Sequence, residues 1–397
     1  MILTFLTLSS TAVGALATIS LLLWKKKVPT KLKSAYPKIS ILKPIRGLEP
    51  DLEVNLHSFF NLRSTIPFEL LFCVKNPSDP CIEIINKLSG LHPHVEAKVF
   101  TGGPDIGRNP KVSNMYLAWE KASSDLLLIS DSNVRVEPSY LETLYAERRT
   151  GAGLVTQAVW GADARTLGGH LDVIHLNTFY LKATAFLKIF GFPCVLGKCM
   201  LFSRNQFNAL GGLFAVRNYL AEDLVTGEMM KEAGYQVALS PELLRQTTVM
   251  GTFKSYWNRH VRWARLRKCH FVVAYLVEPL FFESVWPLAL IALSAHKQER
   301  IIGYVCLAIQ MSENLLLHLL KFKDKSAWKS FLVFWLKDIL APVIWCAGLV
   351  SNKVNWRGQI LQLRFGGKLG TKYLRAARFR KLTARFYSST SCEPHCF

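Results

Sequence analysis

Short apolar runs alternate with polar and turn-forming stretches through the middle of the chain. Each run closes in polar or glycine residues, as the buried strands of a parallel sheet do. The strands that we expect from this pattern are 39–42, 68–74, 95–100, 126–129, 153–159 and 194–202. We expect a helix at 109–123, where Asn109 and Pro110 suit the cap and the first turn, and a long amphipathic helix at 167–190. Strands that alternate with helices predict an α/β fold with a mostly parallel, doubly wound sheet.

The apolar run 126–129 is followed at once by polar residues that include Asp131 and Asn133. Open parallel sheets bind their ligands at the carboxyl ends of the strands. A carboxylate there, with a carboxamide two residues on, suits Mg²⁺ or Mn²⁺ that carries a diphosphate, because hard cations prefer carboxylate and phosphate oxygens. The strand alone leaves a second interpretation open, in which Asp131 caps a turn or the helix that follows Pro138.

Apolar segments crowd both ends of the chain and predict membrane helices. Residues 1–24 carry no charge, are long enough to span a bilayer, and are followed directly by Lys25, Lys26 and Lys27. The positive-inside rule places these lysines on the cytoplasmic side. A cleaved signal peptide is the alternative, but its basic region precedes its apolar stretch. We therefore expect a membrane anchor.

Three further apolar segments follow, at about 271–295, 301–320 and 331–350. Three full crossings would place the basic tail on the other side of the membrane from the α/β region. The last segment contains Lys337 and Pro342, which are tolerated at depth mainly where protein shields the backbone. We expect this segment to be re-entrant or interfacial. The expected division of the chain is an anchor at 1–24, an α/β domain at 25–270 with an interfacial helix at 255–268, a membrane region at 271–350 and a basic cytoplasmic tail at 351–397.

Composition says more about the class of partner that the chain binds than about its fold. Half of the 397 residues are hydrophobic, and the formal net charge of +21 indicates an anionic partner such as nucleic acid, a phospholipid surface or a phosphorylated substrate. Much of this charge lies beside apolar segments, which favours the membrane. The nine cysteines show no CxxC pairing, so we expect free thiols in a reducing compartment and no zinc site.

Several polar residues are candidates for binding or catalysis. Lys43 lies in a loop after the first strand and Lys111 at the start of a helix, and both could receive a phosphate. A solvated surface lysine is the other interpretation of Lys111. Glu222 and Asp223 begin a helix, where the helix dipole alone would explain an acidic pair.

The stretch 255–268 is helical in pattern and dense in basic and aromatic residues. Arg259, Arg262 and Trp263 lie three and four positions apart, hence on one face of the helix. They offer guanidinium groups to a diphosphate and an indole ring to a sugar or lipid. A basic helix that lies on lipid headgroups is the alternative, and opposite faces can serve both purposes.

Together these stretches match a known family pattern. Asp79, Asp131, Asp223 and the run Arg259-His260-Val261-Arg262-Trp263 reproduce the D, D, D, (Q/R)xxRW pattern of the processive and lipid-directed GT-A glycosyltransferases. More narrowly, the chain resembles the ceramide glucosyltransferases from about residue 38 to residue 367. Further motifs of this resemblance are Lys43-Pro44 with Gly47, Asn109-Pro110-Lys111, Gly211-Gly212, Leu266-Arg267, Glu278-Pro279, and Trp356-Arg357 with Gly366-Gly367.

The resemblance implies a GT-A catalytic domain and a role for each matching residue. Asp79 would hold the uridine, Asp131 the metal ion and the diphosphate, and Asp223 would be the catalytic base. The residues expected to close on donor and acceptor are Arg259, Arg262 and Trp263, with Lys43 and Lys111 on the donor side. These roles suit inverting transfer, which needs a carboxylate to take the proton of the attacking hydroxyl and cations to stabilise the departing UDP.

Two departures from the family pattern concern the cation and the acceptor. The sequence Asp131-Ser132-Asn133 lacks a second acid, and the region of Tyr180-Leu181 lacks the His-Pro found in animal ceramide glucosyltransferases. The first departure implies weaker binding of the cation, and the second affects the acceptor pocket.

The expected function is therefore transfer of glucose from UDP-glucose to the primary hydroxyl of ceramide. We expect an integral membrane protein whose catalytic domain faces the cytoplasm, in a bacterial inner membrane or a Golgi membrane, with no nucleic-acid partner. Diacylglycerol or a hopanoid as acceptor, or another UDP-sugar as donor, are the alternatives within the same chemistry. A membrane protein that binds anionic lipid or nucleic acid without catalysis is the alternative outside it.

Overall fold

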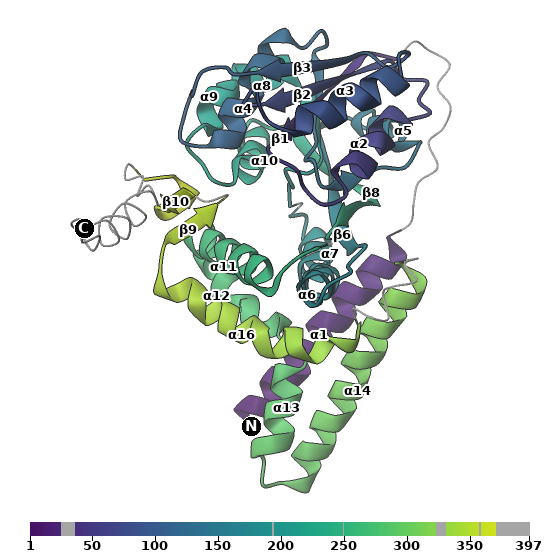
Figure 1. The fold of residues 1–397 in the computed structure, drawn as a ribbon. Helices are drawn as coiled ribbons and strands as arrows, with labels where there is room; N and C mark the ends of the chain where they lie inside the picture. The colour runs from purple at the N-terminus through teal and green to yellow at the C-terminus, as the bar shows by residue number, and fades with distance from the viewer. Residues whose placement is uncertain (25–35, 193, 249, 323–330, 357–358, 371–397) are drawn as a thin grey trace, which may run out of the picture.

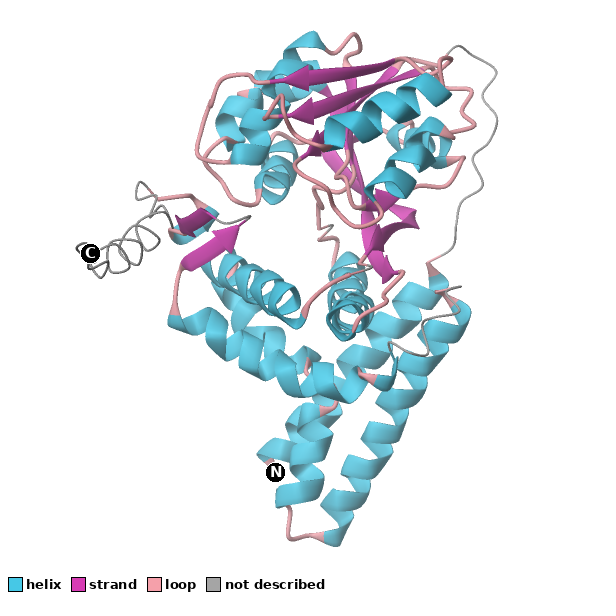
Figure 2. Ribbon diagram, viewed as in Figure 1, coloured by secondary structure: helices cyan, strands magenta, loops and turns pink. Residues whose placement is uncertain are grey.

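The computed structural model describes residues 1–24, 36–192, 194–248, 250–322, 331–356 and 359–370. The lysines at 25–27 and the tail beyond 370 lie outside the described residues. Figure 2 shows the strands gathered in one half of the molecule and long helices in the other.

Eight strands form one mixed sheet in the order β3-β2-β1-β4-β7-β6-β8-β5 (Figure 1). They are β1 (Ile39–Ile45), β2 (Phe68–Val74), β3 (Ala97–Thr101), β4 (Leu126–Ile129), β5 (Val134–Arg135), β6 (Ala152–Ala162), β7 (Met200–Ser203) and β8 (Gln236–Thr247). The first four in spatial order are parallel, as are β6 and β8, whereas β7 is antiparallel to β4 and β6, and β5 is antiparallel to β8. The predicted α/β class and mostly parallel sheet are confirmed.

Both faces of the sheet are covered, which explains why the central strands are apolar without alternation. In β4, Leu126 and Leu128 enter one core cluster, while Leu127 and Ile129 enter the other. Helices α2 (Leu52–Phe60), α3 (Cys81–Leu91) and α5 (Tyr140–Arg148) supply the first cluster, and α4 (Pro110–Lys121), α8 (Arg204–Ala209), α9 (Gly212–Val216) and α10 (Glu222–Glu232) supply the second.

Among the described residues, two helices are long and apolar enough to cross a membrane, α1 (Ile2–Leu23) and α14 (Lys297–Leu320). The predicted segment 271–295 is not one straight helix. It divides into α12 (Val272–Val277), a 3₁₀ turn η2 (Glu278–Phe281) and α13 (Val285–Leu293), with a bend of 59° before α13. The pair could form a third, broken crossing.

Helix α16 (Phe334–Val350) covers most of the last predicted apolar segment. Figure 1 shows it lying across α1, α13 and α14 rather than alongside them. Lys337 and Asp338 are buried within it and pair with each other, and the Ser284 amide donates to Asp338 at 3.2 Å. Protein therefore shields these charges, as expected, whereas the depth of α16 in a membrane stays a prediction.

The remaining elements join the two halves. They are α6 (Leu167–His175), a π turn η1 (Leu176–Tyr180), α7 (Leu181–Ile189), α11 (Phe253–His270), β9 (Lys353–Trp356), β10 (Gln359–Gln362) and a 3₁₀ turn η3 (Phe365–Gly367). The predicted basic helix is confirmed as α11, while the predicted helix 167–190 contains the π turn.

Candidate active site

Asp131 lies just beyond β4, at the carboxyl end of the sheet, among three lysines. Its Oδ1 lies 2.9 Å from Lys111 Nζ, its Oδ2 lies 3.5 Å from Lys198 Nζ, and its backbone oxygen accepts a hydrogen bond from Lys43 Nζ at 2.6 Å. Burial by itself would raise the pKa of Asp131, but the ammonium groups of Lys111 and Lys198 hold it well below its usual range. Asp131 is therefore a carboxylate at neutral pH.

Glu222 and Asp223 begin α10 beside the same lysine. Lys111 Nζ lies 2.8 Å from Glu222 Oε1 and so bridges this acid to Asp131. The Asp223 carboxylate accepts hydrogen bonds from the amides of Gly197 at 2.6 Å and Leu224 at 2.8 Å. Burial, with the neighbouring Glu222 charge, raises the pKa of Asp223 to about 6. This value suits a general base that works near neutral pH.

Gly197 leaves room for the Lys111 ammonium and the Asp223 carboxylate, because it has no side chain. A Cβ at this position would lie 2.9 Å from Lys111 Nζ and 3.0 Å from Asp223 Oδ2. Asn109 supports the other side of the site, because it caps α4 and its Nδ2 donates to Glu222 Oε2 at 3.0 Å. The predicted residues Lys111, Asp131 and Asp223 thus converge at one place.

Lys198 was not singled out from the sequence. Its Nζ donates to Asn133 Oδ1 at 2.7 Å, so that one ammonium lies between the side chains of Asn133 and Asp131. Burial lowers the pKa of Lys198, and the Arg259 guanidinium lowers it further. The charge of Arg259 on α11 therefore acts on Lys198 in the Asp131 site.

Asp131 and Asn133, which share the Lys198 ammonium, offer part of the oxygen ligand set of a divalent metal ion. Within the described part of the chain, no group of three or more His, Cys, Asp or Glu residues could hold a metal by itself. Asp131 and Asn133 would supply two oxygens, and the diphosphate and water would complete the shell, as is usual for Mg²⁺. The ion would take the place of the Lys198 ammonium.

Asp79 and Lys43 contact mainly the surrounding protein, so the contacts described for them support the fold. Asp79 accepts from the Gly47 amide at 2.8 Å and the Cys81 amide at 3.0 Å, and thereby holds the loop after β1 against the end of β2. Lys43 is fully buried, with its Nζ 3.6 Å from the centre of the Phe59 ring. Contact of either residue with the donor stays a prediction.

On α11, Arg259 contacts α6 and Trp263 contacts η1, while Arg262 is partly exposed. Arg259 pairs with the buried Asp172, which also accepts from His260 Nε2 at 2.8 Å. Asp172 was not predicted to belong to the site, and no motif around it could have identified it.

Tyr180 occupies the region where animal ceramide glucosyltransferases have His-Pro. Its ring meets the Trp263 indole edge to face, with 4.9 Å between centres. Its hydroxyl accepts from Arg267 Nη1 at 2.9 Å, and Arg267 forms a two-point pair with Glu278 at 2.7 and 2.8 Å. Leu266-Arg267 and Glu278-Pro279 were separate motifs in the sequence. In the structure Arg267 and Glu278 form an ion pair, and Arg267 and Trp263 both contact Tyr180.

Comparison with known proteins gives consistent similarities. The family profile described as glycosyl transferase family 21 matches residues 2–369. Two proteins of Caenorhabditis elegans, ceramide glucosyltransferases 3 and 1, are 27% and 28% identical to the chain, covering 85% and 84% of it and 75% and 73% of their own lengths. A mannosyltransferase from Pyrobaculum calidifontis, solved with GDP-mannose and Mn²⁺, aligns with 88% of this chain and 98% of its own at 15% identity and a TM-score of 0.47.

Proposed function

The chain belongs to glycosyl transferase family 21 and is a glycosyltransferase; from that premise we propose that it transfers glucose from UDP-glucose to the primary hydroxyl of ceramide. The names of the relatives support ceramide as acceptor. The observation that carries the reaction type is the Lys111 ammonium, held between Asp131 on the donor side and Glu222 next to Asp223.

Asp223 takes the proton of the ceramide hydroxyl as its oxygen attacks the anomeric carbon of the sugar. The new bond forms on the face opposite the departing diphosphate, so the anomeric configuration inverts. Lys111 lies beside Asp131, where negative charge grows on the leaving group, and a fixed cation lowers the energy of such a transition state.

A divalent ion, Mg²⁺ or Mn²⁺, would be held by Asp131 with Asn133 and would neutralise the diphosphate. Arg259 and Arg262 approach the donor from α11, and Trp263 with Tyr180 forms an aromatic wall beside it. We place the acceptor hydroxyl at the membrane surface, because α11 runs from this site directly into the apolar segment that begins with α12.

The proposed orientation has the catalytic domain on the cytoplasmic side of a bacterial inner membrane or a Golgi membrane. The support is the position of the lysines after the first apolar helix, together with the two helices that are apolar enough to cross.

The deciding assay offers UDP-glucose, UDP-galactose and UDP-N-acetylglucosamine to the full-length enzyme in detergent micelles. Each donor is paired with ceramide, diacylglycerol, a hopanoid polyol and a soluble oligosaccharide, and products are identified by mass. We expect glucosylceramide. Preferential extension of the soluble acceptor would contradict delivery from the membrane, and a product on hopanoid or diacylglycerol alone would contradict the ceramide assignment.

A further inference from the structure

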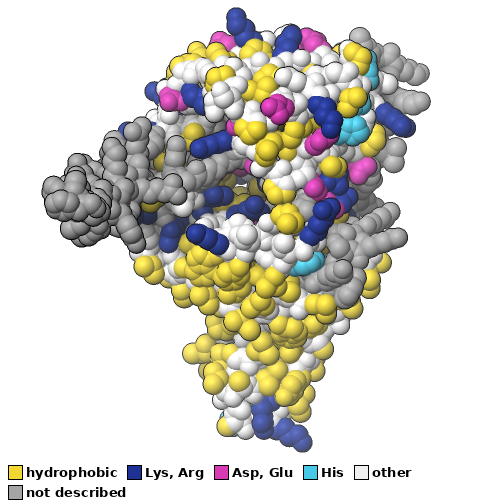
Figure 3. All heavy atoms as spheres, viewed as in Figure 1, with side chains coloured by type: hydrophobic (Ala, Val, Ile, Leu, Met, Phe, Trp, Pro, Cys, Tyr) yellow, Lys and Arg dark blue, Asp and Glu magenta, His cyan; other side chains and the backbone are white. Residues whose placement is uncertain are grey.

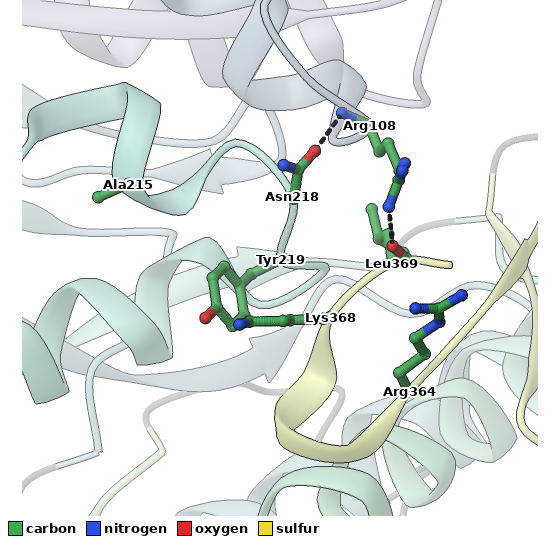
Figure 4. Close-up of a pocket in the computed structure, with 7 residues that line it drawn as sticks. All are labelled: Arg108, Ala215, Asn218, Tyr219, Arg364, Lys368 and Leu369. Carbon is green, nitrogen blue, oxygen red and sulfur yellow. Dashed lines mark hydrogen bonds between the residues drawn. The ribbon is translucent and has the colours of Figure 1, made fainter. Parts of the chain in front are cut away.

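A second basic site lies outside the candidate active site, where the C-terminal segment meets the catalytic domain. It is a cavity of about 260 Å³ between the loop before α4, the loop before α10 and the turn η3 (Figure 4). Its polar lining includes Arg108, Asn218, Tyr219, Arg364 and Lys368. Asp131, Lys111 and Asp223 do not line it, so it is distinct from the proposed donor site.

The lining of this cavity carries three positive charges and no carboxylate. Arg108 Nη1 donates to the Leu369 backbone oxygen at 2.7 Å, and Lys368 Nζ lies 5.5 Å from the centre of the Tyr219 ring. Arg364 lies on the opposite side of the turn from Lys368, and its guanidinium points toward Leu369 (Figure 4). Like charges around one small hollow repel each other, and a phosphate group would turn that repulsion into charge-assisted hydrogen bonds.

The backbone around the cavity is fixed by hydrogen bonds from both parts of the molecule. The Leu369 amide donates to the Asn218 oxygen at 2.8 Å, and the Arg364 amide donates to the Lys368 oxygen at 2.8 Å. Gly366 and Gly367 have φ values of 70° and 73°, which favour glycine, and they close the turn that carries Arg364 and Lys368 on its two sides. This gives the Gly366-Gly367 motif a structural purpose.

Exposed apolar side chains beside the cavity indicate that the phosphate comes from a lipid. Phe365, next to Arg364, is 83% exposed, and Val350, at the end of α16, is 85% exposed. Strands β9 and β10, which pair antiparallel, lie between them in the chain. Figure 3 shows hydrophobic side chains covering the lower part of the molecule, with Lys and Arg gathered directly above them. An aromatic ring flanked by cations is typical of a segment that meets a membrane surface.

We propose that this cavity binds the phosphate of an anionic membrane phospholipid, with Arg108, Arg364 and Lys368 around the phosphate and Phe365 among the acyl chains. Asn109, which follows Arg108, donates to the Tyr219 oxygen at 2.7 Å and to Glu222. A bound lipid thus braces the segment that begins α10, so anionic lipid raises the turnover of the enzyme as well as its thermal stability.

The test uses the full-length protein in detergent and measures Tm against short-chain phosphatidic acid, phosphatidylcholine with the same chains, and inorganic phosphate. We expect a saturable rise in Tm that is largest with phosphatidic acid. Each lost charge-assisted hydrogen bond is worth roughly 1.5–3 kcal/mol, so R364A/K368A should raise the half-saturating concentration at least about tenfold. The control K87A/K121A removes two exposed lysines from the catalytic domain and should titrate as the parent protein does.

Three outcomes would overturn the proposal. One is an unchanged titration of R364A/K368A while that variant still unfolds cooperatively and still binds UDP. Another is inorganic phosphate acting as strongly as phosphatidic acid with no effect of F365S, which would leave an anion site but no lipid site. The last is competition by UDP that depends on Arg364 and Lys368, which would assign the cavity to the donor. The lipid titration needs no substrate turnover, so it does not depend on the proposed acceptor being right.

Discussion

Asp223 can act as a base because its carboxylate is half-buried beside Glu222 and held by two amides. Asp223→Asn keeps the shape and one of the two hydrogen-bond acceptors but cannot take a proton. Loss of a general base typically costs about 10²–10⁴ in rate, so we expect kcat to fall by that factor with donor binding retained. Turnover of radiolabelled UDP-glucose and UDP binding by calorimetry check this. Near-normal turnover in a folded variant would move the role to Glu222.

The raised pKa of Asp223 also predicts a pH profile. The base must be ionised, so activity is level above about pH 7 and falls about tenfold per pH unit below about pH 6. Because the charge of Glu222 contributes to the raised pKa, Glu222→Gln should move the inflection of kcat/KM, which reports the free enzyme, toward lower pH. An inflection near 4, the ordinary range of an Asp side chain, would contradict the environment described for Asp223.

Removal of divalent cations should abolish transfer, because a departing diphosphate needs more positive charge than the nearby lysines provide, and Asp131 and Asn133 supply none. We expect EDTA to stop the reaction, excess Mn²⁺ or Mg²⁺ to restore it, and Asp131→Ala to be inactive at any metal concentration. Asp105→Ala is the matched control, since Asp105 is an exposed acid that pairs only with Lys75 among the ion pairs described. Full turnover by the metal-stripped enzyme would mean that the lysines suffice.

The sequence revealed those site residues that carry a local signal. Asp131 follows an apolar strand, and Asp223 begins a helix within a family motif, so both could be named in advance. Lys198 could not, because its partner Asn133 lies 65 positions away and only the antiparallel return of β7 beside β4 brings them together. Asp172 was missed for the same reason, since it pairs with Arg259 across 87 positions.

Among the elements, periodicity identified strands, α4 and α11. It did not identify the places where a helix is interrupted, which are the π turn η1 and the bend after η2. The π turn η1 and the bend after η2 depend on tertiary contacts such as Tyr180 with Trp263 and Arg267 with Glu278. Single-turn π segments occur often at functional sites, and this one presents Tyr180 to the proposed acceptor side. A hydrophobic pattern cannot predict such a turn, because its spacing stays close to that of an α-helix.

Helix α7 is tied to the apolar helices by a buried ionic cluster. Lys182 Nζ lies 2.6 Å from Glu283 and 2.9 Å from Glu313, and all three are buried. Lys182→Met would leave two carboxylates without their cation, and breaking a buried pair costs about 3–5 kcal/mol. We expect a marked loss of Tm in detergent, measured with Lys188→Ala on the same helix as control. Lys182→Met/Glu283→Gln should recover part of the loss, and equal stability of Lys182→Met and the parent would contradict a structural role for the cluster.

At the scale of the whole molecule, the prediction is that catalytic domain and tail lie on one side of the membrane. Helix α16 lies across the others, so the apolar segments need not cross an odd number of times after the catalytic domain (Figure 1). An impermeant thiol reagent added to intact cells should fail to label Cys392 and Cys396, which lie outside the described residues. Permeabilised cells give the positive control, and efficient labelling of intact cells would restore three ordinary crossings.

The packing of α1 has a consequence for the biosynthesis of the protein. Its inward side carries Thr7, Ser10, Thr11, Gly14 and Thr18, and Gln310 of α14 donates to Thr11 at 2.8 Å. Helix α1 therefore leaves the ribosome long before Gln310, which lies 299 positions after Thr11, can donate to the hydroxyl groups of its inward side. Until then these groups face lipid, where polar side chains favour association with other helices. A nascent chain that stops short of α14 thus exposes the polar side of α1 to membrane chaperones and proteases.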